Sequence, residues 1–167
     1  YKKGKLQYEE LAKYLRDNEK IIKINDMLHI LKDNVYTSDT KQIEKVMLKY
    51  IKNSTNAIRT EVLRYLDLLC QETKMSNPKY ILIENGIYNL ESKKLEDLNS
   101  TFIIKNKISW NYNPNAYNKS VDTVLNNISC NDKKLRALLE ECIGYCLFRR
   151  NELGKCIILT GEGKNGE

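Results

Sequence analysis

Histidine and long apolar runs are scarce in this 167-residue sequence, and each shortage excludes a class of protein. The only histidine, His29, leaves no Ser/His/Asp or Cys/His constellation to assemble, and a catalytic or metal role for it has no support. No apolar run approaches the roughly 18 residues that a membrane-spanning helix needs. No paired-carboxylate site can be argued either. We therefore expect no catalytic residues and no membrane contact.

The five cysteines do not form a metal-binding pattern, because no two of them have C-x-x-C spacing. Cys142 and Cys146 lie one helical turn apart, but a zinc site needs a denser cluster of cysteine and histidine. We expect all five to be buried, small apolar side chains in a reducing cytosol, with no metal bound.

The composition is that of a folded, soluble chain. Apolar residues make up 41% and charged residues 30%, which separates the sequence from disordered chains. Its length suffices for one ordinary domain or two small ones with a real core. The net charge of +6 comes from 28 basic and 22 acidic residues, spread along the sequence. A mildly basic domain suits contact with a polyanion, although many plain globular domains have the same charge.

Residues 1–76 have the pattern of a small helix-and-hairpin module. Apolar periodicity predicts three helices, at residues 5–16, 40–52 and about 57–72. Asp39 is placed to cap the second helix, with Gln42 three residues further on. The β-prone runs between the first two helices are divided by two turn signals, Asn25-Asp26 and Asp33-Asn34.

Residues 77–153 predict a β-hairpin followed by helices. Pro78 disfavours helix in the residue before it and marks a boundary. Asn-Gly at 85–86 lies between β-prone runs, a strong hairpin signal because both turn positions favour positive φ. Apolar patterns further along predict a strand within 101–112 and two helices, one about 121–128 and one about 132–149.

A short apolar run at residues 156–160 is followed by a glycine-rich segment at residues 161–167. Cys156 to Thr160 have the pattern of a buried parallel strand. Gly161 and Gly166 then have the spacing of the phosphate-binding pattern G-x-x-x-x-G-K-[ST], in which glycine lets backbone N–H groups approach phosphate oxygens. The lysine of that pattern falls at position 167, which is Glu167.

Two other interpretations of this segment remain open on the residues alone. Gly161, Gly163 and Gly166 also spell G-x-G-x-x-G, but a dinucleotide site needs a following helix and an acidic residue about 20 positions on. The third interpretation, which ranks below the phosphate-binding loop, is a flexible terminus.

A resemblance to a known family rests on six segments in a fixed order. They are Ile21–Tyr36, Arg59–Leu66 (reading Arg-x-Glu-Val-x-x-Tyr-Leu), Glu84–Leu90, Lys107–Asn115, Leu138–Leu147 with its internal Gly-Tyr, and Ile158–Gly166. In this order they resemble the poxvirus-NTPase-like domain that precedes the superfamily 3 helicase motor in phage and plasmid primase-helicases. The resemblance extends over nearly the whole chain.

This resemblance implies an accessory pre-motor domain that links primase to an ATP-driven helicase in DNA replication. It implies a phage, prophage or plasmid protein in a bacterial cytoplasm, with DNA and other subunits of a helicase ring as partners. Together with the initial Tyr1, it suggests a fragment that ends within the Walker A loop. The incomplete ATP-binding residues would be Gly161, Glu162, Gly163, Lys164, Asn165 and Gly166.

Glu167 departs from the family pattern, so the segment cannot be carried over as a working nucleotide site. We expect ATP and Mg²⁺ to belong to the parent protein, no cofactor in this fragment, and no ATP hydrolysis by the fragment alone. We also expect the parent to have Lys and then Ser or Thr at positions 167 and 168.

Arg59 and Arg64 are candidate contacts to DNA phosphates, since both lie on one predicted helix. The competing interpretation is a solvated helix face on which Glu61 and Asp67 are local ion-pair partners.

Three aromatic residues also allow two interpretations. Trp110, Tyr112 and Tyr117 could stack on single-stranded bases, but such aromatics more often anchor a core or a loop.

Taken together, the sequence predicts an α+β chain in three parts. These are a helix and β-hairpin module at 1–76, a hairpin plus helical pre-motor module at 77–153, and the start of a truncated superfamily 3 helicase domain, with the first strand of its P-loop, at 154–167. The alternative function is a protein-interaction or oligomerisation module without nucleic-acid contact. Salt dependence separates the two, because phosphate contacts weaken steeply with salt.

Overall fold

The computed structural model describes residues 7–98, 101–158 and 160. As predicted, the chain is α+β: the described residues form five helices and two antiparallel sheets of three strands each. The chain divides into two compact units. Unit 1 comprises residues 1–76 and 99–107, and unit 2 comprises residues 77–98 and 108–167.

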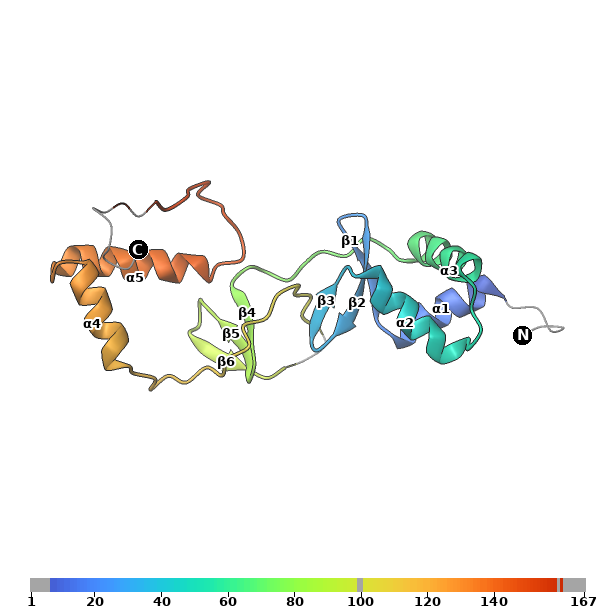
Figure 1. Cartoon of the computed structure of the whole chain (residues 1–167), viewed down its shortest axis with the longest axis horizontal. Helices are drawn as coiled ribbons and strands as arrows, with labels where there is room; N and C mark the ends of the chain where they lie inside the picture. Colours follow the sequence, from blue (N-terminus) through green and yellow to red (C-terminus); the bar gives the residue numbers. More distant parts are fainter. Residues whose placement is uncertain (1–6, 99–100, 159, 161–167) are drawn as a thin grey trace. The chain divides into compact units, whose positions relative to one another are not determined.

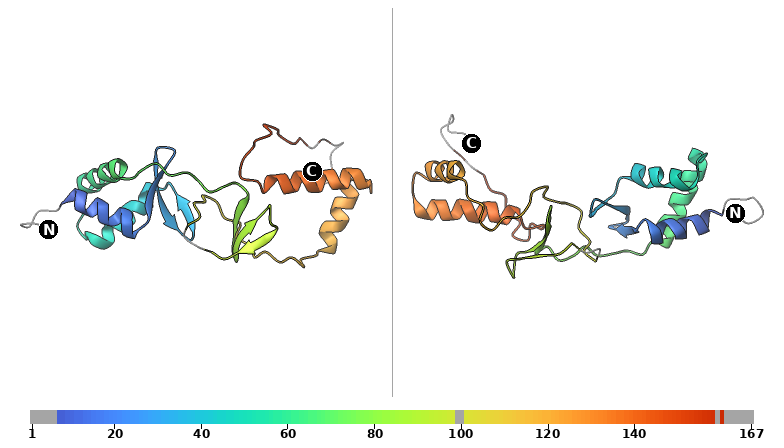
Figure 2. Two further views of the ribbon diagram at one scale, coloured as in Figure 1. Left: turned by 180° about the vertical axis from the view of Figure 1, so that it is seen from behind. Right: turned by 90° about the horizontal axis from the view of Figure 1, so that it is seen from below.

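Unit 1 packs three helices on one side of a small sheet with the strand order β1-β2-β3 (Figures 1 and 2). Its elements are α1 Tyr8–Asn18, β1 Ile21–Ile24, β2 Met27–Lys32, β3 Val35–Thr37, α2 Thr40–Tyr50 and α3 Asn56–Leu69. The three predicted helices are therefore confirmed, with ends shifted by a few residues.

The two predicted turns of unit 1 are also confirmed. Asn25 and Asp26 have φ values of 50° and 57°, and Asp33 and Asn34 have φ values of 50° and 66°. Asn and Asp tolerate this left-handed region better than other non-glycine residues, and two-residue turns of this kind match the twist of the strands they join.

The core of unit 1 comes from the apolar stripes of its helices and one face of its sheet. The residues exposed by no more than 1% include Ala12, Leu15, Ile21, Ile43, Met47, Val62 and Leu66. Each fully buried Val, Leu, Ile or Met side chain contributes roughly 1.5–3 kcal/mol of hydrophobic stabilisation.

Unit 2 contains a second sheet, with the order β4-β5-β6, and two helices. Its elements are β4 Tyr80–Ile83, β5 Gly86–Asn89, β6 Lys94–Glu96, α4 Lys119–Ile128 and α5 Lys133–Cys146. The predicted hairpin and both helices are confirmed, whereas β6 was not anticipated from the sequence.

The turn of the β4–β5 hairpin is displaced by one residue from the prediction. Gly86 pairs with Ile83, so the two turn residues are Glu84 and Asn85. Asn85 is not among the residues with positive φ. Its side chain instead forms two hydrogen bonds with the backbone of Tyr112. The Asn-Gly signal therefore located the hairpin correctly but not its turn.

The strand predicted within 101–112 is wrong, because the described residues there are irregular and form only one isolated β-bridge, at Ile108. Its hydrogen bonds are divided between the two units. The Tyr36 N–H donates to the Ile104 carbonyl at 2.9 Å in unit 1, and the Ile108 N–H donates to the Leu82 carbonyl at 2.9 Å in unit 2. With so few bonds to either sheet, the segment does not become a regular strand.

The buried strand predicted for Cys156 to Thr160 is not formed by the described residues. Cys156, Ile157 and Ile158 are exposed and irregular, and Leu159 lies outside the described residues. A strand needs a neighbour for its backbone hydrogen bonds, and the described part of the chain pairs none with this segment.

The prediction that all five cysteines are buried is also wrong. Cys70 is buried and Cys142 is half-buried, whereas Cys130, Cys146 and Cys156 are exposed. The exposed cysteines belong to unit 2, where α4 and α5 bury no residue fully. No helix among the described residues is long and apolar enough to cross a membrane.

Candidate nucleic-acid interface

The net positive charge of the chain lies in unit 1. Residues 1–76 contain 15 basic and 11 acidic residues, and Lys105 and Lys107 raise the basic count of unit 1 to 17. Unit 2 holds the remaining 11 basic and 11 acidic residues and carries no net charge. A polyanion is therefore attracted to unit 1 rather than to unit 2. The linear sequence does not show this difference in net charge between the units, because the basic residues are spread along the chain.

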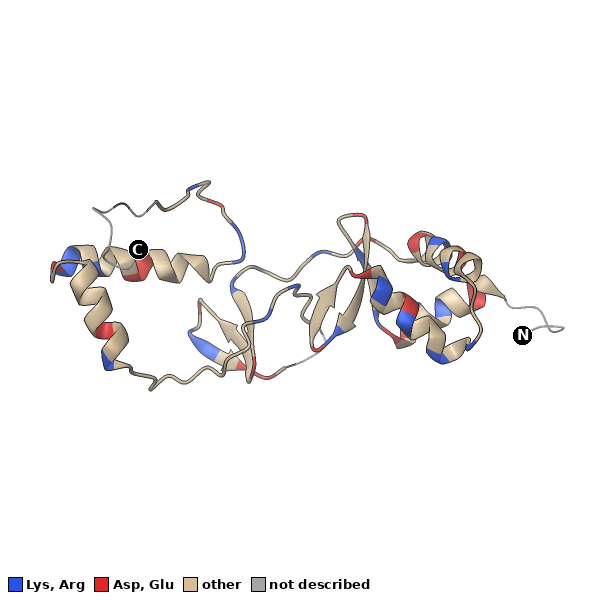
Figure 3. Cartoon of the chain, viewed as in Figure 1, with Lys and Arg blue, Asp and Glu red and all other residues tan. Residues whose placement is uncertain are grey.

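A row of lysines follows the outer face of α2, and we call it the α2 lysine row. Lys41, Lys45 and Lys49 are spaced by four residues, so they lie on one face at intervals of about 6 Å along the helix axis. All three are exposed, and Figure 3 shows basic segments recurring along α2. None of the three has an ion-pair partner among the described residues.

The position of the α2 lysine row follows from the local sequence. Asp39 caps the helix by accepting a hydrogen bond from the Lys41 N–H at 3.0 Å, as predicted, and the Gln42 side chain donates to the other carboxylate oxygen at 3.2 Å. Ile43 and Met47 are buried on the opposite face. Like charges four residues apart cost an isolated helix roughly 0.2–0.5 kcal/mol per pair. The α2 lysine row therefore does not stabilise α2. This cost favours a role for the row in binding a ligand rather than in holding the fold together.

Arg59 and Arg64, the two candidates from the sequence, lie in different surroundings. The Arg59 guanidinium donates to the Ser54 carbonyl at 2.7 Å and lies 3.5 Å from the Glu44 carboxylate. Arg64 is 72% exposed at its side chain and forms only a 3.4 Å contact with Glu61. Arg59 is thus engaged within the fold, whereas Arg64 remains accessible to a ligand.

The local partners predicted for these arginines are confirmed in part. Glu61 pairs with Arg64, but Asp67 pairs with Lys23 of β1 at 2.7 Å. The hydrogen bond with Asp67 is the main reason that the pKa of Lys23 is raised.

A groove of about 640 Å³ lies beside Arg64 in unit 1. Its lining comes from β2, the start of α2, and α3: Met27, Leu28, Ser38, Thr40, Thr60, Leu63, Arg64, Asp67 and Leu68. The start of α2, through Thr40, and Arg64 therefore border the same groove.

The structure offers no argument for a metal or a histidine-based site in the described residues. Within 7–98, 101–158 and 160, no three His, Cys, Asp or Glu side chains come together to hold a metal ion. His29 is 1% exposed, and its Nδ1 lies 2.8 Å from the Met27 carbonyl oxygen, so its role is structural. The candidate ATP-binding residues Gly161 to Gly166 lie outside the described residues.

Comparison with protein families gives a match over most of the chain. A family model described as "D5 N terminal like" matches residues 2–142, which include all the strands and four of the helices of the described structure and most of the fifth. No curated protein gives a significant match. The chain therefore belongs to the D5 N terminal like family, the pre-motor domain of primase-helicase proteins.

Proposed function

We propose that this chain is the accessory pre-motor domain of a phage or plasmid DNA primase-helicase, which links primase to an ATP-driven helicase and contacts the DNA backbone through unit 1. Family membership supports the role in replication. The observation that carries the DNA contact is the α2 lysine row, three exposed cations without partners among the described residues. Arg64 adds a fourth accessible cation.

Contact through lysines implies a particular mode of binding. Each ammonium is a compact point charge that neutralises a phosphate without reading a base. Neutralised phosphates release counterions, so binding is weak, independent of sequence and reduced by salt. The domain would hold DNA near the motor while catalysis occurs elsewhere in the parent protein.

Gly161 to Gly166 are proposed as the beginning of the motor's Walker A loop. The proposal rests on the glycine spacing and on family membership. ATP and Mg²⁺ would then be ligands of the parent motor, and the subunits of a helicase ring in the bacterial cytoplasm would be its partners. No catalytic residue is assigned to this chain.

A substitution series tests the DNA contact. Lys41→Gln, Lys45→Gln and Lys49→Gln are combined, and binding to a labelled DNA duplex is measured by fluorescence anisotropy across a range of salt. The slope of log K against log salt is negative, and loss of three phosphate contacts should make it less steep by about 2.7, since each contact accounts for roughly 0.9.

A matched control removes the same charge from unit 2. Lys93→Gln, Lys94→Gln and Lys133→Gln change three exposed lysines of unit 2, whose net charge is zero. This variant should leave the slope of log K against log salt unchanged. An equal loss in both triple variants would show that only net charge matters and would refute the α2 lysine row as the interface.

The second candidate function is a protein-interaction or oligomerisation module. It is favoured by the apolar faces of α4 and α5, where Val121, Val124, Leu138 and Ile143 are each more than half exposed. Association through these faces would be insensitive to salt and would be abolished by Leu138→Glu, as measured by sedimentation.

A further inference from the structure

Trp110 combines a fixed backbone with a free ring. Its carbonyl accepts a hydrogen bond from the Glu84 N–H at 3.1 Å, and two residues earlier Ile108 pairs in parallel with Ile83 of β4. The residue is nevertheless 80% exposed. A tryptophan is rarely left so exposed, because its ring has one of the largest apolar surfaces of any side chain.

The segment is anchored again just after Trp110. The Asn85 side chain donates to the Tyr112 carbonyl at 3.1 Å and accepts from the Tyr112 N–H at 2.8 Å. The Tyr112 ring lies 4.6 Å from the Tyr88 ring, between centroids, at an interplanar angle of 40°. Tyr112 is therefore a loop anchor, one of the two roles open to it from the sequence, while Trp110 is neither buried in a core nor packed as an anchor.

The neighbours of Trp110 suit a nucleobase better than a protein surface. Ser109 and Asn111 flank it, and both are exposed. A protein-binding hot spot is normally set in a wider contact area that excludes water around the aromatic side chain. An exposed aromatic plane with hydroxyl and amide groups beside it can stack on the face of a base and form hydrogen bonds with its edge.

We propose that Trp110, held by β4 and Asn85, is a stacking site for an unpaired base of single-stranded DNA. The inference rests on the proposed function and specifies the state of the DNA, because bases within a duplex are already stacked on one another. It assigns unit 2 a role that its zero net charge does not suggest, since stacking needs an exposed ring and not a cationic surface.

The experiment uses Trp110 as its own probe, because it is the only tryptophan in the sequence. The chain is titrated with an oligothymidylate strand and with an abasic strand of equal length and charge. We expect the bases to quench the tryptophan fluorescence and the abasic strand to leave it unchanged. Equal responses to both strands would overturn the proposal, as would no response to either.

Substitutions then test the energy of the contact, with a labelled strand and anisotropy as the readout. Trp110→Ala should weaken oligothymidylate binding about tenfold or more, with little effect on the abasic strand, and Trp110→Phe should restore part of the loss. Tyr117→Ala tests the other largely exposed stacking candidate, which is 75% exposed, and should weaken binding less than Trp110→Ala. Equal weakening by the Tyr117 and Trp110 variants would overturn the assignment to Trp110.

The two proposals fail in distinguishable ways. Unchanged Trp110 fluorescence, with duplex binding that still depends on the α2 lysine row, removes only the stacking site. If the unaltered chain does not bind the duplex, or binds it independently of the α2 lysine row, while base-dependent quenching is intact, only the backbone contact is removed. A fluorescence shift that depends on protein concentration without DNA would place the ring in a protein contact and overturn the stacking site. Circular dichroism of each variant verifies that it folds.

Discussion

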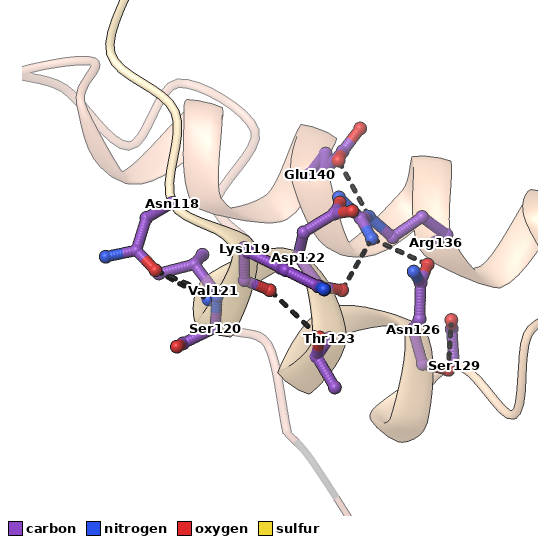
Figure 4. Close-up of polar contacts among 10 residues, drawn as sticks. All are labelled: Asn118, Lys119, Ser120, Val121, Asp122, Thr123, Asn126, Ser129, Arg136 and Glu140. Atoms are coloured by element: carbon purple, nitrogen blue, oxygen red, sulfur yellow. Dashed lines mark hydrogen bonds and ion pairs between the residues drawn. The ribbon is translucent and has the colours of Figure 1, made fainter.

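Arg136 of α5 binds Asp122 of α4, with its Nη2 atom 2.7 Å from the Asp122 carboxylate (Figure 4). The same guanidinium donates to the Asp122 carbonyl at 3.1 Å, to the Asn126 side chain at 2.7 Å and to Glu140 at 2.8 Å. The hydrogen bond with Asp122 is the largest cause of the raised pKa of Arg136. Because neither helix buries a residue fully, we infer that this polar cluster orients α4 against α5.

Replacing Arg136 with lysine should loosen this pair of helices. A single ammonium cannot reproduce the planar set of donors that joins Asp122, Asn126 and Glu140. We expect the backbone amides of α4 to exchange faster with deuterium, as measured by mass spectrometry. Lys134→Arg, at an exposed position of the same helix, is the control. Unchanged exchange in Arg136→Lys would show that apolar contacts orient the helices.

Leu66 and Leu68 of α3 provide a matched test of the unit 1 core. Leu66 is 0% exposed, whereas Leu68 is 82% exposed. Leu66→Ala should lower the free energy of unfolding by about 2–5 kcal/mol, and Leu68→Ala should change it by less than about 0.5 kcal/mol. Urea unfolding measures both. Similar losses in the two variants would contradict the assignment of this core.

Gly86 and Gly144 should respond oppositely to alanine. Gly86 has a φ of 158°, and a Cβ there would lie 2.7 Å from the Glu96 carbonyl oxygen. Gly86→Ala should therefore destabilise unit 2 by more than about 1 kcal/mol. A Cβ at Gly144 meets nothing within 4 Å, and alanine in this helix should stabilise it by up to about 1 kcal/mol. Thermal unfolding of both variants measures the two effects. Unchanged melting temperatures in both variants would contradict the prediction.

Tyr50 makes unit 1 sensitive to alkaline pH. Its hydroxyl donates to the Glu19 carboxylate at 2.6 Å, and this bond is the main reason that the pKa of Tyr50 rises to about 12 from an ordinary value of 10.0. The fold therefore favours neutral tyrosine, so its contribution to stability is complete below pH 10 and is lost as the pH rises from 10 to about 12.

The measurement compares Tyr50→Phe with the unaltered chain. Urea midpoints determined from pH 9 to pH 12 should fall more steeply for the unaltered chain, because phenylalanine has no proton to lose. Phenylalanine preserves the ring that contacts Tyr14, where the centroids are 5.2 Å apart. If the urea midpoints of the two chains fell in parallel with pH, the Tyr50 hydroxyl would not contribute to the pH dependence of stability.

Thiol labelling tests the exposure of the cysteines. Cys70 is buried, and burial is the main reason that its pKa is raised, so its reactive thiolate is disfavoured. Cys130, Cys146 and Cys156 are exposed. We expect these three to react with an alkylating reagent in the native chain and Cys70 only after unfolding, as followed by peptide mass spectrometry. Rapid native labelling of Cys70 would contradict its position in the core.

Local pattern determined most of the secondary structure. The helices, the turns at Asn25-Asp26 and Asp33-Asn34, and the three-lysine spacing of α2 all depend on residues within a few positions of one another. Periodicity and turn chemistry act over this range, so the sequence specifies them directly. Family membership was likewise indicated by the order of segments along the chain.

Tertiary contacts decided the features that bear on the candidate site. Arg59 binds the Ser54 carbonyl and the Glu44 carboxylate, whereas Trp110 is exposed. Both outcomes depend on which groups of other elements lie next to each side chain. The return of residues 99–107 to unit 1, which places the whole charge excess there, depends on long-range pairing. Periodicity carries no information on such pairing, because hydrogen bonds and burial between remote segments are settled only when the chain packs.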